Sequence, residues 1–176
     1  MEHDLGSMTA IRLPYDFDTV AVWKTILKGM FGLQLVIVPG ILYSIFVSKD
    51  LAAATGLLAI GVVWAGFTRI FVKNPDGCTG TLDADEIVVK PGDLYGFRLP
   101  GPQGRFPLHQ FSGVLVKESL GPIQPGVQGG PHEKIYLIGK DGTPDILIAR
   151  TERRTGAALG REFGTLLGLR CEVQLA

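Results

Sequence analysis

The densest group of like charges in the sequence consists of three arginines, Arg150, Arg153 and Arg154. Guanidinium groups bind phosphate through paired hydrogen bonds, so arginines grouped beside a membrane are suited to contact with anionic lipid headgroups. Glu152 lies within the group, and acidic residues slightly outnumber basic ones over residues 74–176. Two interpretations of the three arginines therefore remain open. They contact lipid headgroups, or they lie in solvent at the start of a helix near the C-terminus.

The other residues that could carry chemistry are scattered. Cys78 and Cys171 lie far apart with no CxxC pattern, and the three histidines lack the spacing of metal ligands. The acidic group Asp83, Asp85 and Glu86 favours a solvated hairpin tip over a metal site. No phosphate-binding GxxxxGK[ST] or GxGxxG, no HExxH and no GxSxG is present. The sequence therefore predicts no catalytic residues, no metal and no cofactor.

Composition narrows the class of protein. The 176 residues include 17 Lys and Arg and 17 Asp and Glu, so the formal net charge is zero. A general nucleic-acid-binding protein should be clearly basic, so we expect no nucleic-acid partner. Hydrophobic residues make up 46% of the chain, and the excess is concentrated in residues 26–72.

The apolar excess forms two adjacent charge-free runs. Residues 29–48 and 51–68 contain no charged side chain, and Lys49 and Asp50 between them suffice for a tight turn. A helix of about 20 residues spans the hydrocarbon core of about 30 Å. Two such runs in succession favour a transmembrane helical hairpin over two buried helices of a soluble core.

The charges that flank the hairpin predict its orientation. Lys24 and Lys28 precede the first span, and Arg69 and Lys73 follow the second. The positive-inside rule then places both termini in the cytoplasm, with the lipid bilayer crossed twice. The chain divides into an N-terminal cytoplasmic or interfacial segment, a transmembrane hairpin and a cytoplasmic domain, with bounds 1–24, 25–73 and 74–176.

The second span is rich in small residues, and Gly56, Gly61 and Ala65 are the candidate contacts to a partner helix. In lipid, close approach of two helix backbones over small residues is a main source of association. The partner is either the first span or another subunit. Neither span contains Asp, Glu, Lys, Arg or His, which argues against an ion channel or a transporter.

Beyond residue 74, short alternating segments predict antiparallel strands, and Gly- and Pro-rich residues 119–134 predict a loop. Thr151 is the expected N-cap of a final helix. That helix carries one apolar stripe at helical spacing: Ala158, Leu159, Phe163, Leu166 and Leu167.

Three segments carry a resemblance: GTLDADEIVVKPG, the hairpin LIGKDGTPDILIA, and the helix ARTERRTGAALGREFGTLLGL. Over residues 28–176 the chain resembles small bacterial membrane proteins that carry a PH-like domain after a two-helix hairpin. This resemblance implies an α+β fold, in which a transmembrane hairpin precedes a small antiparallel PH-like β-barrel or sheet capped by a C-terminal helix. It also implies the bacterial inner membrane.

The expected function follows from these patterns. We expect a non-enzymatic, membrane-anchored accessory, assembly or scaffolding subunit of a larger inner-membrane complex. Its partners would be other membrane-protein subunits, with a second copy of the chain as a further candidate. The alternative is a membrane-anchored sensor of anionic lipid headgroups, which would use the three arginines.

Overall fold

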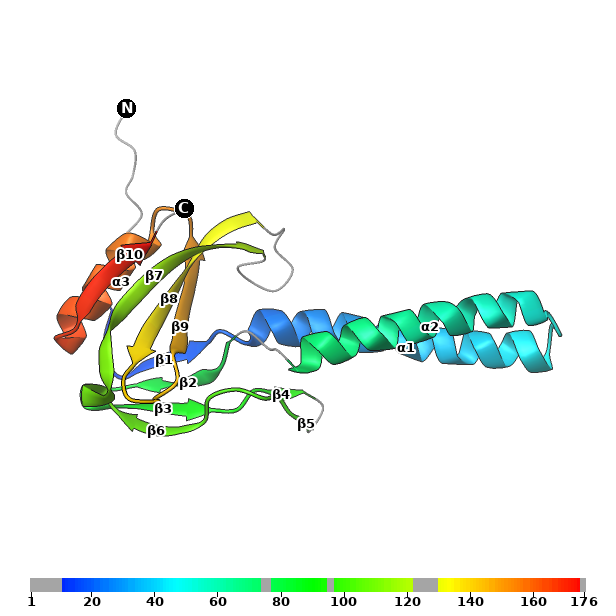
Figure 1. The fold of residues 1–176 in the computed structure, drawn as a ribbon, viewed down its shortest axis with the longest axis horizontal. Helices are drawn as coiled ribbons and strands as arrows, with labels where there is room; N and C mark the ends of the chain where they lie inside the picture. The colour runs from blue at the N-terminus through cyan, green and yellow to red at the C-terminus, as the bar shows by residue number, and fades with distance from the viewer. Residues whose placement is uncertain (1–10, 74–76, 95–96, 122–129, 175–176) are drawn as a thin grey trace, which may run out of the picture.

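The computed structural model describes residues 11–73, 77–94, 97–121 and 130–174, and it is of the α+β class. Two long N-terminal helices project from two sheets, and a C-terminal helix packs against the second sheet (Figure 1). The bounds of the helices are α1 Ala21–Phe46, α2 Leu51–Lys73 and α3 Gly156–Leu167.

Helices α1 and α2 form the predicted hairpin. Both are long and apolar enough to cross a membrane, and only 17% and 11% of their most apolar windows are buried within the chain. A helix in the core of a soluble protein would be mostly buried, so these low fractions fit lipid-facing helices. The turn is closed by Asp50, whose N–H donates to the Ser44 carbonyl (3.0 Å) and whose carboxylate accepts the Ala53 N–H (2.9 Å).

The first sheet has the strand order β1-β2-β3-β6, with every neighbouring pair antiparallel. Its strands are β1 Tyr15–Asp18, β2 Thr79–Leu82, β3 Glu86–Lys90 and β6 Gly104–Pro107. Strand β1 belongs to the segment that the sequence assigned to a separate N-terminal piece, and it pairs with β2 from beyond both helices. The sheet therefore includes chain from both sides of the hairpin.

A short hairpin of β4 (Asp93–Leu94) and β5 (Phe97–Arg98) lies between β3 and β6 in the chain. Residues 95 and 96, between these two strands, lie outside the described residues. Leu99, directly after β5, packs with Val20 and Leu27 beside the start of α1.

The second sheet has the order β10-β7-β8-β9. Its strands are β7 Phe111–Gly121, β8 Gly130–Gly139, β9 Ile146–Glu152 and β10 Arg170–Gln174, and the 3₁₀ turn η1 Leu108–Gln110 links β6 to β7. Strand β10 is parallel to β7, so the predicted all-antiparallel arrangement is wrong for this strand. The sheets also do not close into a barrel, because among the described residues β1 and β9 share no ladder.

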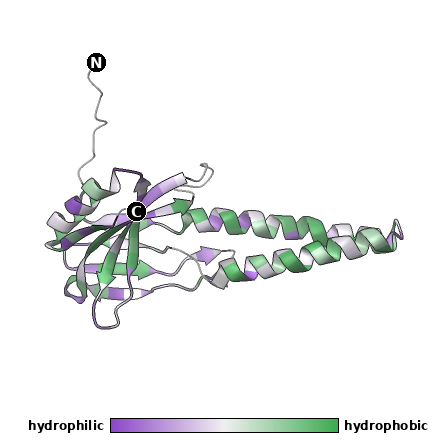
Figure 2. Cartoon of the chain, turned by 45° about the horizontal axis from the view of Figure 1, so that its top comes forward, coloured by the Kyte–Doolittle hydropathy of each residue, from purple (hydrophilic) through white to green (hydrophobic). Residues whose placement is uncertain are grey.

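The interior between the two sheets and α3 is filled with large apolar side chains. Phe111, Ile135 and Phe163 are fully buried, and the Tyr15 ring meets Phe163 edge-on at 5.1 Å between ring centres. Gly160 of α3 lies directly over Val116, where a side chain would collide with the strand. Figure 2 shows the apolar residues in this interior and along both long helices.

Two local predictions near α3 and β7 are wrong. Thr151 is a residue of β9 rather than the N-cap of α3, which begins at Gly156 after the N-cap Thr155. Residues 119–121 and 130–134, predicted as loop, continue β7 and β8, while residues 122–129 lie outside the described residues. Strand pairing therefore extends further along both arms of this hairpin than its Gly and Pro content indicated.

Candidate interaction surfaces

The small residues of α2 lie on two different faces. The face toward α1 includes Gly61, where an added Cβ would stand 3.2 Å from the Ile37 side chain. The same contact includes Gly40 of α1, opposite Leu57, and a hydrogen bond from the Trp64 indole N–H to the Met30 carbonyl (3.0 Å). Gly61 therefore packs within the chain, against α1. Contact with the first span was one of the two alternatives that the sequence left open.

Gly56 and Ala65 do not share that role. Both are exposed, and an added Cβ at Gly56 would meet no described atom within 4 Å. Gly56 belongs to a stripe at helical spacing that points away from the α1 contact, and we call it the outward face of α2. The residues of this face are Ala52, Gly56, Ala59, Val63 and Gly66.

The bulky residues Ile60, Val62 and Phe67 flank the outward face of α2 and are themselves more than half exposed. Apart from Val63, the face consists of small residues between bulky ones, an arrangement that suits close contact with a second helix. The exposed face of α1 is different, because Leu35, Val36 and other large side chains cover much of it.

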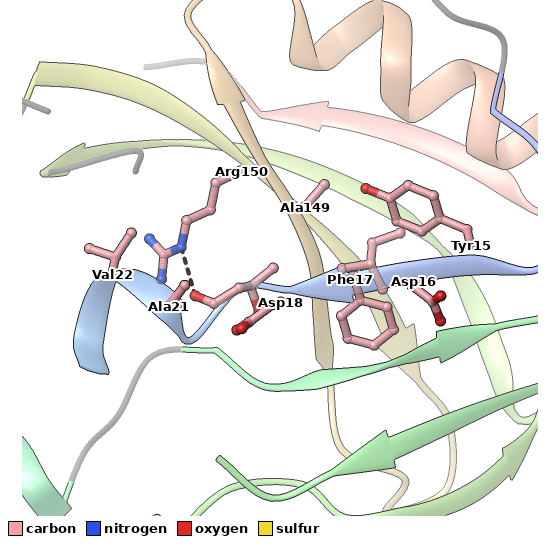
Figure 3. Close-up of a pocket in the computed structure, with 10 residues that line it drawn as sticks. Tyr15, Asp16, Phe17, Asp18, Ala21, Val22, Ala149 and Arg150 are labelled. Atoms are coloured by element: carbon pink, nitrogen blue, oxygen red, sulfur yellow. Dashed lines mark hydrogen bonds between the residues drawn. The ribbon is translucent and has the colours of Figure 1, made fainter. Parts of the chain in front are cut away.

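The three arginines do not form one site. Arg150 lies in β9, and its Nε donates to the Thr19 carbonyl (3.3 Å) beside the start of α1 (Figure 3). Arg153 and Arg154 lie in the turn before α3, and Arg153 pairs with Glu118 at 3.0 Å. The predicted group is thus divided between the helix junction and the α3 turn.

A cavity of about 210 Å³ lies where β1 passes β9, and Figure 3 shows the residues that line it. Its polar groups already make contacts within the chain. The Asp16 carboxylate accepts the Thr81 hydroxyl (2.6 Å), and Arg150 contacts Thr19 as described. The Arg150 contact joins β9 to the residue after β1, whereas the Asp16 contact lies within the first sheet, between β1 and β2.

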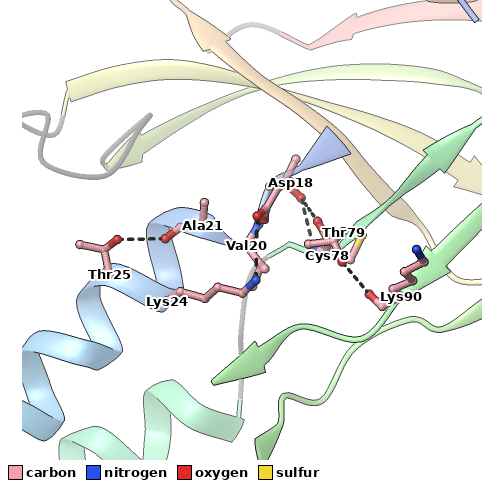
Figure 4. Close-up of polar contacts among 9 residues, drawn as sticks. Asp18, Val20, Ala21, Lys24, Thr25, Cys78, Thr79 and Lys90 are labelled. Atoms are coloured by element: carbon pink, nitrogen blue, oxygen red, sulfur yellow. Dashed lines mark hydrogen bonds and ion pairs between the residues drawn. The ribbon is translucent and has the colours of Figure 1, made fainter. Parts of the chain in front are cut away.

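The junction between β1 and α1 is tightly bonded to β2 (Figure 4). Thr19, only 5% exposed, donates its N–H to the Cys78 carbonyl (2.9 Å), and its hydroxyl accepts the Cys78 N–H (3.0 Å). The Asp18 carboxylate accepts the Val20 N–H (3.2 Å) and pairs with Lys24 at 3.9 Å. The helical hairpin is therefore joined to the first sheet by specific bonds.

Gly77 makes this junction possible. Its φ of +123° is strained for any residue with a side chain, and an added Cβ would lie 2.5 Å from the Thr19 carbonyl oxygen. The chain that returns from α2 can thus approach the β1–α1 junction only with glycine at this position. No sequence pattern had singled out Gly77 or Thr19.

Sequence analysis also missed Glu133. This carboxylate is 1% exposed and accepts the backbone N–H groups of Arg154 (2.8 Å) and Gly156 (2.6 Å). It therefore holds the N-terminus of α3, where the helix dipole favours a negative charge. No local pattern could have indicated it, because the carboxylate comes from β8 rather than from the residues before the helix.

Burial changes the acidity of two side chains. Burial raises the pKa of the Cys171 thiol, while nearby Arg161 lowers it to a smaller extent, and burial raises the pKa of Tyr15. Within the described ranges, no three His, Cys, Asp or Glu side chains gather as a metal site would require.

Comparison of the chain with protein-family models, with curated proteins and with solved structures finds no match. The chain is an α+β protein with two helices long and apolar enough to cross a membrane, two packed sheets and a helix near the C-terminus.

Proposed function

We propose that the chain is a non-enzymatic, membrane-anchored accessory, assembly or scaffolding subunit of a larger bacterial inner-membrane complex. The observation that carries the proposal is the outward face of α2. The inner face of this helix, with Gly61, already packs on α1, whereas Gly56 on the opposite side meets no described atom. A second helix could approach this face closely, which is the geometry that favours association in lipid.

The pairing of β1 with β2 supports a two-pass topology. Strand β1 precedes α1 and β2 follows α2, and their four registered pairs require both strands to lie on one side of the membrane. Lys24, Lys28 and Arg69 lie toward that side, so the positive-inside rule assigns it to the cytoplasm.

The sheet domain supports a role in protein contact. Two packed four-stranded sheets with α3 against the second resemble a PH-like module in which β1 and β9 share no ladder. We propose that this module contacts other subunits of the complex. The alternative, a headgroup sensor built on Arg150, Arg153 and Arg154, has weaker support because the three side chains do not converge.

The test is a leucine substitution on the outward face of α2. Tagged Gly56→Leu and wild-type chains are extracted from their native membrane in a mild detergent, and the co-purifying membrane proteins are compared. We expect Gly56→Leu to insert and fold but to lose its partners, because the added side chain prevents close approach of a second helix. The matched control is Val62→Leu, which enlarges a side chain that is already bulky and exposed.

Full recovery of the partners with Gly56→Leu would contradict the proposal. If the wild-type chain recovers only a second, differently tagged copy of itself, the protein is a homo-oligomer and the accessory-subunit proposal is wrong.

A further inference from the structure

We infer that Gln34 of α1 joins two copies of this chain inside the membrane. In this dimer the side-chain amide of Gln34 hydrogen-bonds to the same amide of the second copy. The inference goes beyond the proposed function, because it concerns α1 and a second copy of the chain rather than α2 and another subunit. It requires only that the helical hairpin crosses the membrane.

Gln34 is a polar residue within the first apolar run. It lies five residues after Gly29, where the charge-free run begins, which corresponds to about 7–8 Å along the helix axis. When the hairpin crosses a bilayer, this depth places the amide inside the hydrocarbon core. Water does not satisfy its two donor hydrogens and its acceptor oxygen there, so the amide is costly unless another group in the membrane binds it.

The helical hairpin does not satisfy this amide. Met30 and Ile37, one turn before and one turn after Gln34, are each only 7% exposed and contact Trp64 and Gly61 of α2. Gln34 itself is half-buried, so it lies at the rim of that contact. Its side chain forms no hydrogen bond with any residue that the structure describes. The amide is therefore accessible to a helix from outside the chain.

Three other polar side chains of the two spans bond within the hairpin. The Trp64 indole N–H donates to the Met30 carbonyl (3.0 Å). The hydroxyls of Thr55 and Thr68 donate to the carbonyls of Leu51 and Trp64, one turn earlier in α2 (2.9 Å each). Each of these donors is satisfied without a partner chain, whereas the donors of Gln34 are not.

A second copy of the chain meets the requirement of Gln34. A glutamine amide is both donor and acceptor, so two identical amides can form reciprocal hydrogen bonds. All copies insert in the same orientation, so a two-fold axis along the membrane normal brings both Gln34 residues to the same depth. Glutamine side chains that hydrogen-bond across helices favour association in lipid. Phe31 and Val38, exposed apolar residues one turn to either side of Gln34, then pack around the amide pair.

The test measures disulfide crosslinking of the full chain, purified and reconstituted alone into phosphatidylcholine vesicles at low protein density. Single cysteines are introduced at Val38, one turn from Gln34, and at Val36, on the opposite side of α1. Both valines are more than half exposed, and the background is C171S because the remaining Cys78 is buried. After oxidation we expect a disulfide-linked dimer from V38C and little or none from V36C, which is the matched control.

Removal of the amide tests Gln34 itself. A hydrogen bond between helices in lipid changes association by about fivefold to thirtyfold, so Q34L should lower the yield of V38C dimer by about tenfold. Q34L makes α1 more apolar, so the chain should still insert. Equal dimer yields from V38C and V36C would overturn the inference, as would a V38C yield that Q34L leaves unchanged.

Two further measurements separate this dimer from the contacts of the proposed function. Gly56→Leu changes only the outward face of α2, so it should leave the V38C dimer intact, and loss of the dimer would contradict a contact made by α1. Oxidation in native membranes should also give the V38C dimer. A V38C crosslink to a different protein there, with no dimer in the vesicles, would assign Gln34 to another subunit and overturn the inference.

Discussion

The helical hairpin and the sheet domain differ in the size of the residues at their internal contacts. In the sheet domain, large side chains such as Phe111 and Phe163 are fully buried. In the hairpin, glycines such as Gly40 and Gly61 lie at the helix contact, and large side chains such as Phe46 face outward. The difference shows that a helix pair in lipid associates through close backbone approach, whereas a domain in water needs buried apolar volume.

Truncation of a core residue should have the largest effect and should be confined to the sheet domain. Phe163→Ala removes a fully buried ring, which costs about 3–5 kcal/mol of the 5–15 kcal/mol that stabilise a typical domain. We expect limited proteolysis in urea, on the full chain in nanodiscs, to cleave the sheet domain at much lower denaturant while the hairpin stays protected. Wild-type resistance of Phe163→Ala would show that α3 does not complete the core.

A second prediction concerns the buried carboxylate of Glu133 in the same domain. Glu133→Gln keeps the shape but turns an amide donor toward the N–H groups of Arg154 and Gly156. The expected loss is about 2–3 kcal/mol, measured by thermal unfolding, because a buried donor is left unsatisfied. Glu152→Gln is the matched control, since Glu152 is exposed on the neighbouring strand and should leave the melting temperature unchanged.

The hairpin should respond to enlargement rather than to truncation. Gly61→Leu places a side chain where even a Cβ lies 3.2 Å from Ile37, so the two helices must separate, at about 1–3 kcal/mol. A disulfide between cysteines introduced at Ile37 and Gly61 reports the close approach in the native hairpin. A leucine at Gly66, which faces open space, should leave the helix pair intact. Equal effects at the two glycines would refute the division of α2 into two faces.

The smallest effect is expected at the surface of the sheet domain. Arg153→Ala removes a half-exposed partner of Glu118, and solvent screening limits the loss to less than about 1 kcal/mol. Its melting temperature should therefore lie close to that of the wild type and well above that of Phe163→Ala. The reverse order would make the turn before α3, rather than the core, the main source of stability.

The two regions also differ in how well the sequence predicted them. The charge-free runs predicted both long helices, because lipid imposes a simple rule of length and composition. The apolar stripe around Phe163 likewise predicted α3, apart from its start. In both cases the signal lies within one continuous segment.

Features that join distant segments could not be predicted in this way. Strand β1 is four residues long, and its partner β2 follows some sixty residues later, so no adjacent pattern indicates the pair. The roles of Glu133 and Gly77 depend on backbone groups brought near by the fold. The arginines were misplaced because β9 continues through Arg150 to Glu152, although these residues are polar.

Strand β1 has a consequence for biosynthesis. It leaves the ribosome before either helix, but the strand with which it pairs leaves only after both helices have been made. Under the proposed two-pass topology, the first sheet can be completed only once the hairpin has entered the bilayer and returned the chain to the starting side. A molecule inserted with a single crossing would leave β1 and β2 on opposite sides of the membrane, with the edge of β2 unpaired. On that topology, the pairing of β1 with β2 reports that both helices have been inserted.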